Sequence, residues 1–288
     1  MKSNRLSAKE WGERIVLALL FTAIGSLIII VFSPLRPYLD VVVDYLGRIG
    51  LILLLLITVL LLRKSTRFEK YWQVFLGLLI MAIAVSLDWV FGRYLMDSLG
   101  INGKTPVSFA LLKLNECVVI ACAVVLFTRM GGGSLGSIYI QKGNLKQGLL
   151  IGGIAFIVCI AGSIPMTFLM FKPGDLTFTR IIPWIPWILI SVLANATQEE
   201  LLFRGLFLRK LQPFYGKFLS TLLIVFVFTL LHKGVTYTSN DFIFLAVLLP
   251  LGLVWGTIMQ KTDGLWGSIL FHAGTDIPIF LSIFSNFK

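Results

Sequence analysis

Long apolar segments separated by short polar turns make up most of this sequence. Residues 51–62 read Leu-Ile-Leu-Leu-Leu-Leu-Ile-Thr-Val-Leu-Leu-Leu, without the polar alternation that marks the strands of a transmembrane barrel. A helix needs about 20 apolar residues to cross the hydrocarbon core of a bilayer. The pattern therefore predicts an all-α polytopic membrane protein with about nine transmembrane helices, eight being the alternative. We expect the spans at residues 13–33, 42–62, 71–92, 107–128, 147–171, 182–208, 217–238, 241–260 and 264–286.

Positive charges are distributed unevenly between alternate loops. Lysines and arginines gather before the first expected span, in the loop 63–70, and again near residues 142–146 and 209–217. Because cytoplasmic loops carry such an excess, we expect the N-terminus inside and, with nine crossings, the C-terminus outside. The short loops and the lack of an organelle-targeting segment favour a multi-pass protein of a prokaryotic cell membrane.

Composition supports a membrane protein and argues against a nucleic-acid-binding protein. Hydrophobic residues make up 57% of the 288 residues and charged residues only 14%, whereas soluble domains carry about 25% charged residues. The net charge of +11 does not indicate a nucleic-acid partner, since the basic residues are spread over short loops, where they encode topology. The expected partner is the lipid bilayer, and the oligomeric state is not readable from the sequence.

A glycine-rich segment divides the chain into two parts. It begins Gly-Gly-Gly-Ser-Leu-Gly after Met130 and interrupts the apolar pattern. We expect an N-terminal membrane segment of about four helices at 1–130, a linker at 131–144 and a catalytic helical core at 145–288. In the first part, Lys113 and Glu116 have the i,i+3 spacing of a helical ion pair. That pair either locks helix packing or contacts a substrate or partner.

Three charged residues lie together inside one apolar segment of the second part. They are Glu199, Glu200 and Arg204, and each charge at the centre of a bilayer costs about 2.5–3.5 kcal/mol on insertion scales. On a helix Glu200 and Arg204 are i,i+4 neighbours, while Glu199 points about 100° away. We therefore expect Arg204 to hold Glu200 and to leave Glu199 free to accept a proton. Asn195, one turn earlier, is placed to hydrogen-bond Glu199.

The only two histidines of the chain lie in the same part, each in an apolar segment. His232 ends the stretch Phe-Thr-Leu-Leu-His, and His272 begins the stretch His-Ala-Gly-Thr-Asp that ends at Asp276. With a rise of about 1.5 Å per residue, both histidines and Glu199 fall at mid-membrane depths. The sequence therefore predicts that they converge in one site.

These three motifs together resemble a known family. Glu-Glu-x-x-x-Arg, Phe-x-x-x-His and His-x-x-x-Asp on successive helices are similar to the motifs of the CAAX protease and bacteriocin-processing (CPBP) family, also called Abi proteins, which includes the type II CAAX prenyl endopeptidases. The resemblance covers residues 145–288. It implies intramembrane hydrolysis of a peptide bond in a peptide or membrane-anchored protein. By this resemblance Glu199 and His232 activate a water, His272 and Asp276 stabilise the oxyanion, and Glu200 and Arg204 support the site.

Two alternatives concern the mechanism. An ionised Asp276 cannot donate a hydrogen bond to an oxyanion, so it is either protonated or orients His272. Glu199, His232 and His272 also match the ligand types of a catalytic zinc site. No His-Glu-x-x-His motif is present, and we favour a glutamate-dependent mechanism without a cofactor, with zinc as the alternative.

Two further alternatives concern the function. One is a non-catalytic immunity or regulatory membrane protein that uses the same fold to bind a peptide or partner. The other is a transporter whose buried charges line an ion path. Transporters of this kind typically contain inverted repeats and interrupted helices in both halves, and the sequence shows neither.

Overall fold

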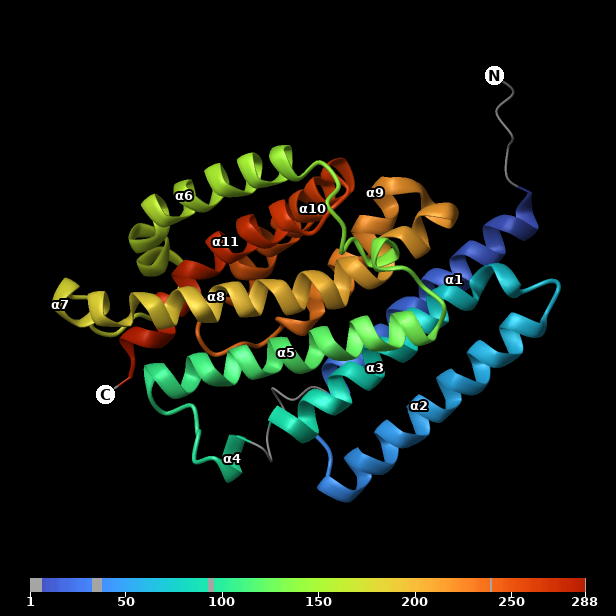
Figure 1. Cartoon of the computed structure of the whole chain (residues 1–288), viewed down its shortest axis with the longest axis horizontal. Helices are drawn as coiled ribbons and strands as arrows, with labels where there is room; N and C mark the ends of the chain where they lie inside the picture. The colour runs from blue at the N-terminus through green and yellow to red at the C-terminus, as the bar shows by residue number, and fades with distance from the viewer. Residues whose placement is uncertain (1–6, 33–37, 93–95, 239, 288) are drawn as a thin grey trace.

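The described residues of the computed structural model, 7–32, 38–92, 96–238 and 240–287, form a bundle of long helices (Figure 1). Within these residues there is no named strand, and β pairing is limited to an isolated bridge between Phe171 and Thr238. The helices in chain order are α1 (Ala8–Ser26), extended by the π-helical turn η1 (Leu27–Val31), α2 (Val41–Lys64), η2 (Glu69–Tyr71), α3 (Trp72–Val90), α4 (Met96–Ser98), α5 (Pro106–Met130), η4 (Leu135–Ile138), α6 (Leu145–Met170), α7 (Phe178–Ile181), η5 (Ile182–Trp184), α8 (Ile185–Glu199), η6 (Glu200–Gly205), α9 (Leu206–Leu231), α10 (Asp241–Thr262) and α11 (Trp266–Ser285).

Polar side chains fix where several helices begin. Ser7 and Glu10 form a capping box at the start of α1, and Thr105 caps α5 with proline as the next residue. Asn240 accepts a hydrogen bond from the backbone N–H of Ile243 at the start of α10. These caps satisfy N–H groups that a helix leaves without internal partners. They fix the starts of α1, α5 and α10 at Ala8, Pro106 and Asp241.

Eight helical stretches in the described part are long and apolar enough to cross a membrane. One of them, Phe178–Leu231, has 54 residues and joins two of the expected spans. Gly216 breaks it with φ 70° and ψ −175°. The ring centroids of Phe203 and Phe228 are 5.1 Å apart, although a straight helix would separate these residues by about 37 Å. The chain therefore turns back here, so this stretch consists of two apolar helical segments. The predicted all-α membrane fold is confirmed.

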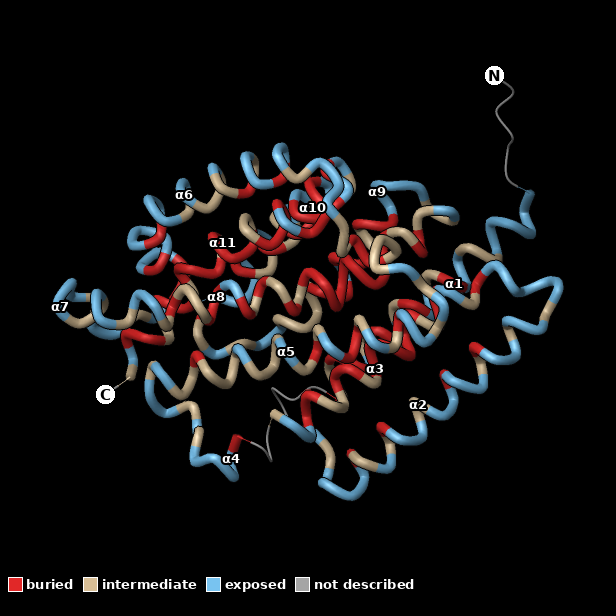
Figure 2. Tube along the Cα trace, viewed as in Figure 1, coloured by how far each residue is buried: buried red, intermediate tan, exposed pale blue. Residues whose placement is uncertain are grey.

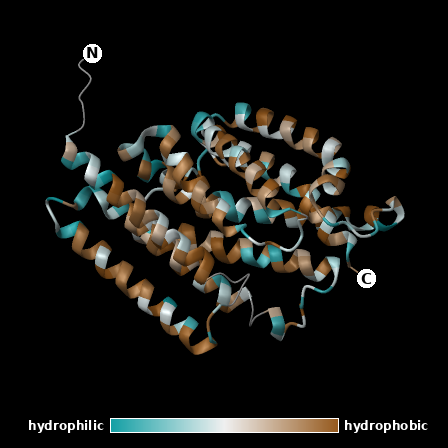
Figure 3. Cartoon of the chain, turned by 180° about the vertical axis from the view of Figure 1, so that it is seen from behind, coloured by the Kyte–Doolittle hydropathy of each residue, from teal (hydrophilic) through white to brown (hydrophobic). Residues whose placement is uncertain are grey.

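The helices differ in how much of their surface other helices cover. In the most apolar windows of α3 and α11, 67% and 72% of the residues are buried, against 17% for α2 and 11% for α6. Figure 2 shows α2 and α6 as outer helices with long exposed faces, and Figure 3 shows that much of this surface is apolar. Apolar outer faces are what a bilayer requires. The polar residues are therefore expected inside, around α3, α8, η6, α9 and α11.

The segment 131–144, expected to be a linker, packs against the turn between α10 and α11. The backbone N–H of Leu265 donates to Tyr139, and that of Asn144 donates to Thr262. Gln141 donates from its side chain to the carbonyl of Asp263 at 2.8 Å. At Gly143, which has φ +49°, a Cβ would overlap backbone atoms of the same turn. The segment is thus held against the turn between α10 and α11 by backbone and side-chain hydrogen bonds.

Candidate active site

The glutamate pair lies where α8 passes into a π-helical turn, with Glu199 as the last residue of α8 and Glu200 as the first of η6. η6 follows α8 directly, and the N–H of Leu206 bonds to the carbonyl of Leu201, five residues back. All six residues of η6 are buried. Single π-helical turns within α-helices are frequently found at functional sites. Here the turn spans the two residues, Glu200 and Arg204, whose i,i+4 pairing the sequence predicts.

Glu200 is held by three side chains. Arg204 Nη1 lies 2.6 Å from its Oε1, and both side chains have no exposed surface. His272 Nδ1 lies 2.8 Å from the same oxygen, and Ser268 donates to the other oxygen, Oε2. A buried carboxylate is costly unless it is paired and hydrogen-bonded. These contacts meet that requirement, and they join η6 to α11 in the centre of the bundle.

Two aromatic residues fix the orientation of the charged groups. The guanidinium of Arg204 lies 4.8 Å from the ring centre of Phe228 and 5.0 Å from that of Trp255. The imidazole of His272 stacks on Trp255 at 3.9 Å between centroids, with an angle of 11° between the planes. Cation–π contacts of this kind are strongest where water is excluded. Arg204 and His272 therefore have little freedom to reorient.

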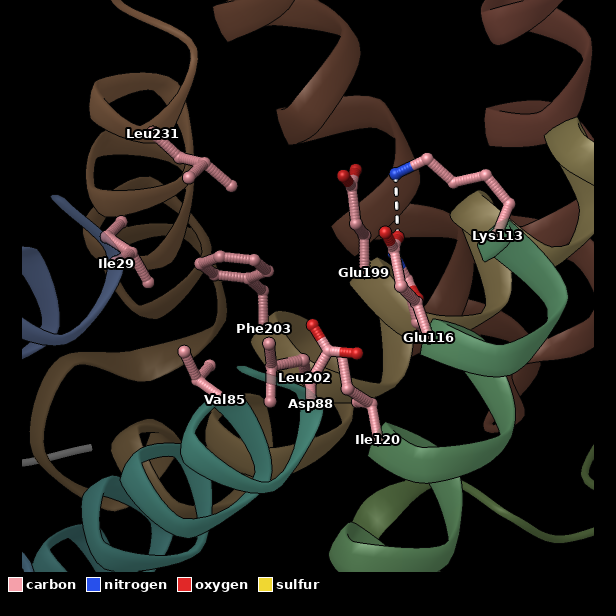
Figure 4. Close-up of a pocket in the computed structure, with 11 residues that line it drawn as sticks. Ile29, Val85, Asp88, Lys113, Glu116, Ile120, Glu199, Leu202, Phe203 and Leu231 are labelled. Carbon is pink, nitrogen blue, oxygen red and sulfur yellow. Dashed lines mark hydrogen bonds and ion pairs between the residues drawn. The ribbon is translucent and has the colours of Figure 1, made fainter. Parts of the chain in front are cut away.

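Glu199 has a different environment from its neighbour. Its Oε2 lies 3.5 Å from His272 Nε2, and this buried oxygen has no hydrogen-bond partner in the described chain. The side chain retains 14% of its surface exposed and lines a cavity between α3, α5 and η6 (Figure 4). In this geometry Glu200 is fully engaged, whereas Glu199 has an unpartnered oxygen in the described chain and borders the cavity.

Asp276 and Asn195 meet at the far side of His272. Asn195 donates from Nδ2 to Asp276 Oδ2 at 3.0 Å, so the expected bond from Asn195 to Glu199 is replaced by one to Asp276. The difference arises because α11 lies against α8 and brings a second acceptor within reach. Asp276 Oδ1 lies 3.6 Å from His272 Nε2, which places that nitrogen between two carboxylates.

His232 lies at the end of α9, apart from these direct contacts. Its Nδ1 is 3.0 Å from the carbonyl oxygen of Phe228, and its ring packs against Phe228 and Phe244. In the described structure no hydrogen bond or ion pair joins it to Glu199. Of the two histidines, His272 is the one with a ring nitrogen beside Glu199. The ring of Phe228 contacts both histidines, at 4.7 Å and 5.9 Å between centroids.

The residues of the zinc alternative do not form a ligand set in this geometry. Among the described residues, no three His, Cys, Asp or Glu side chains are grouped as a metal site requires. Glu199 and His272 are neighbours, but His232 binds a backbone carbonyl and lies outside their contact. A catalytic zinc site needs three converging protein ligands. The three residues therefore do not fit a catalytic zinc ion in this geometry.

Two residues of the site, Ser268 and Trp255, were not predicted from the sequence. Ser268 lies one helical turn before His272 and shares its face, so the i,i+4 spacing would have found it. Trp255 stacks on His272 from α10, and no local spacing relates it to the motifs. Its position follows from helix packing alone.

Ser268 offers a direct test of the buried cluster. Substitution Ser268→Ala removes one donor from a fully buried carboxylate, which is expected to lower the free energy of unfolding by about 1–3 kcal/mol. Thermal unfolding of the purified protein in detergent measures it. Ser191→Ala is the matched control, because Ser191 is equally buried but bonds only to the carbonyl of Trp187 in its own helix. Equal effects of the two substitutions would contradict a special role for Ser268.

Comparison with known families identifies this part of the chain. Residues 181–278 match the family model described as type II CAAX prenyl endopeptidase Rce1-like. This match to residues 181–278, referred to below as the Rce1-like domain, supports the CAAX protease family. No curated protein and no solved structure gives a significant match.

The limits of the Rce1-like domain follow the helices of the site. It starts at the end of α7 and reaches into α11, so it includes the glutamate pair, both histidines and Asp276. Helices α1–α6 lie outside it. The family supports a CAAX-type intramembrane protease, in agreement with the apolar helices that surround the site.

Proposed function

We propose that this protein is an intramembrane endopeptidase in which Glu199 acts as the general base. One observation carries the proposal: the carboxylate of Glu199 borders an open cavity, has an unpartnered oxygen in the described chain, and lies 3.5 Å from His272. A general base must be able to reach both water and substrate. The Rce1-like match supports the reaction class, since the description of that family names an endopeptidase.

In the proposed reaction, Glu199 accepts a proton from a water molecule as the water oxygen attacks the carbonyl carbon of the scissile bond. The carbonyl π electrons move to the carbonyl oxygen, and a tetrahedral oxyanion forms. When this intermediate collapses, the C–N bond breaks and the proton on Glu199 passes to the leaving nitrogen. The products are a carboxylic acid and an amine, which together contain the atoms of one peptide bond and one water.

His272 is the proposed donor to the oxyanion. A protonated imidazole donates from both nitrogens, so Nδ1 can remain bonded to Glu200 while Nε2 faces the developing charge. A donor held in place before the reaction is the most effective kind, and the stacking on Trp255 supports this function. Asp276, bonded to Asn195, would orient the imidazolium and would not itself donate.

His232 is the proposed second contact of the water. Because its Nδ1 lies at hydrogen-bond distance from the carbonyl of Phe228, a neutral ring donates there and keeps an acceptor at Nε2. A water held between Nε2 and Glu199 would bridge two residues that do not touch directly. The substrate would be a peptide or a membrane-anchored protein segment that enters the cavity beside Glu199.

Metal dependence is the first property to test. Purified protein in detergent is expected to cleave members of a broad peptide library at an unchanged rate after treatment with a strong chelator, because the proposed base and donors are side chains. Cleavage is followed by mass spectrometry, with Glu199→Gln protein as the blank. Loss of cleavage with the chelator and its return with added zinc would overturn the metal-free mechanism.

A further inference from the structure

The cavity beside Glu199 is built from two parts of the chain. The Rce1-like domain contributes Gln198, Glu199, Leu202, Phe203 and Leu231 to its wall, and helices outside the domain contribute the rest. The cavity has a volume of about 80 Å³, which is enough to hold several water molecules. The residues from outside the domain are Ile29, Val85, Asp88, Lys113, Glu116 and Ile120.

The two charged side chains that α5 contributes to the cavity neutralise each other. Lys113 Nζ lies 2.7 Å from Glu116 Oε2 (Figure 4), which confirms the ion pair expected from their spacing. Gln198 donates to the same oxygen of Glu116 at 3.4 Å. The ammonium of Lys113 is therefore already matched by one carboxylate, and this contact chain fixes α5 against the residue that precedes Glu199.

Asp88 on α3 has no ion-pair partner among the described residues. It is 5% exposed, and its Oδ1 has no hydrogen bond in the described chain. The nearby cation of α2, Arg48, is held by Asp44 at 2.7 Å and by the carbonyl of Phe32. In Figure 4 the carboxyl group of Asp88 points into the cavity. An unpaired carboxyl group in such a place is costly, and it needs an explanation.

We propose that Asp88 is the specificity-determining residue of a subsite that binds a basic side chain of the peptide substrate. The cavity contains three carboxyl groups, those of Asp88, Glu116 and Glu199, and one ammonium group, that of Lys113. A lysine or arginine side chain of the substrate would supply a cation and donate to Oδ1 of Asp88, which has no hydrogen-bond partner in the described chain. This inference rests on the proposed endopeptidase function.

The remaining lining suits the rest of such a side chain. Val85, Leu202 and Phe203 line the cavity with apolar surface beside Asp88. Lysine and arginine have long apolar stems that pack on such surface while the charged end reaches a polar group. Since Glu199 lines the same cavity, a side chain bound here belongs to a residue near the scissile bond. In this way α3 and α5 would select substrates for the Rce1-like domain.

The first experiment uses wild-type protein alone. Two peptide libraries are compared that differ only in one fixed residue, lysine in one and norleucine in the other, placed in turn at each position around the cleaved bond. Norleucine has the same straight chain without the ammonium group. At one position kcat/KM is expected to be at least about 10-fold higher with lysine, the size of one charge-assisted hydrogen bond in a dry site. Equal rates at every position would overturn the subsite.

The second experiment assigns the preference to Asp88. In Asp88→Asn protein the ratio of lysine to norleucine cleavage is expected to fall to within about 3-fold of unity, because the amide is neutral and nearly the same size. The matched control is Asp97→Asn, the same substitution on the exposed helix α4, which should keep the wild-type ratio. An unchanged ratio in Asp88→Asn protein would overturn the role of Asp88.

Failure of the subsite and failure of the proposed function give different results. Cleavage that is lost in Glu199→Gln protein, with no lysine preference in the wild type, removes only the subsite. Cleavage that persists in Glu199→Gln protein overturns the proposed mechanism and, with it, the basis of the subsite.

Discussion

Glu199→Gln protein is expected to cleave peptides about 10²–10⁴-fold more slowly than wild type while remaining folded. The loss is the usual contribution of a general base. Folding should survive because Glu199 Oε2 makes no hydrogen bond in the described chain, so an amide of the same shape leaves no partner unpaired. The rate constant kcat, measured on the best peptide from the library, and the unfolding temperature in detergent together check this expectation.

The control for Glu199→Gln is the same substitution at Glu69, which is exposed between α2 and α3. Glu69→Gln protein should match wild type in both measurements. Full activity in Glu199→Gln protein would remove Glu199 from the chemistry. A loss of activity accompanied by a large fall in unfolding temperature would instead assign it a structural role.

Arg204→Met protein is expected to lose about 3–5 kcal/mol of stability, the cost of removing one partner from a buried ion pair. Arg204 has no exposed surface and lies against Glu200, Phe228 and Trp255. Methionine fills part of its volume but leaves Glu200 with an uncompensated buried charge. Unfolding by denaturant in detergent, and the yield of membrane-inserted protein, measure the effect.

A second substitution separates the charge from the packing. In Arg204→Met/Glu200→Leu protein part of the lost stability should return, because no unpaired carboxylate remains. Arg209→Met is the matched control, since Arg209 forms its ion pair with Asp263 at the surface, where such pairs contribute about 0–1 kcal/mol. Equal losses in Arg204→Met and Arg209→Met protein would show that burial of the pair has no special weight.

Contacts within one helical turn were predictable from spacing. The pairs Glu200–Arg204 and Lys113–Glu116 formed as the i,i+4 and i,i+3 rules predict. The all-α membrane class was equally predictable, because a bilayer admits few other structures. The ion pairs follow from residue spacing within one helix, and the fold class follows from the requirements of the bilayer.

Contacts between helices were not predictable in the same way. Asn195 bonds to Asp276, 81 residues away, and Trp255 reaches His272 from another helix. Asp88 borders the cavity of Glu199 only because α3 and α5 pack beside η6. These positions depend on helix crossing angles and rotations, which one sequence does not specify through spacing. The resemblance pairs Glu199 with His232 through a water, and spacing could not predict that His272 would have a ring nitrogen 3.5 Å from Glu199.

The reversal at Gly216 has a consequence for biogenesis. The two crossings on either side of it form a helical hairpin that can enter the bilayer as one unit during synthesis. Within that hairpin Arg204 already has Glu200 at 2.6 Å and the ring of Phe228 at 4.8 Å. A pair of opposite charges enters hydrocarbon at lower cost than either charge alone. The translocon would thus receive the most polar part of the chain in a form that is partly neutralised before α10 and α11 are made.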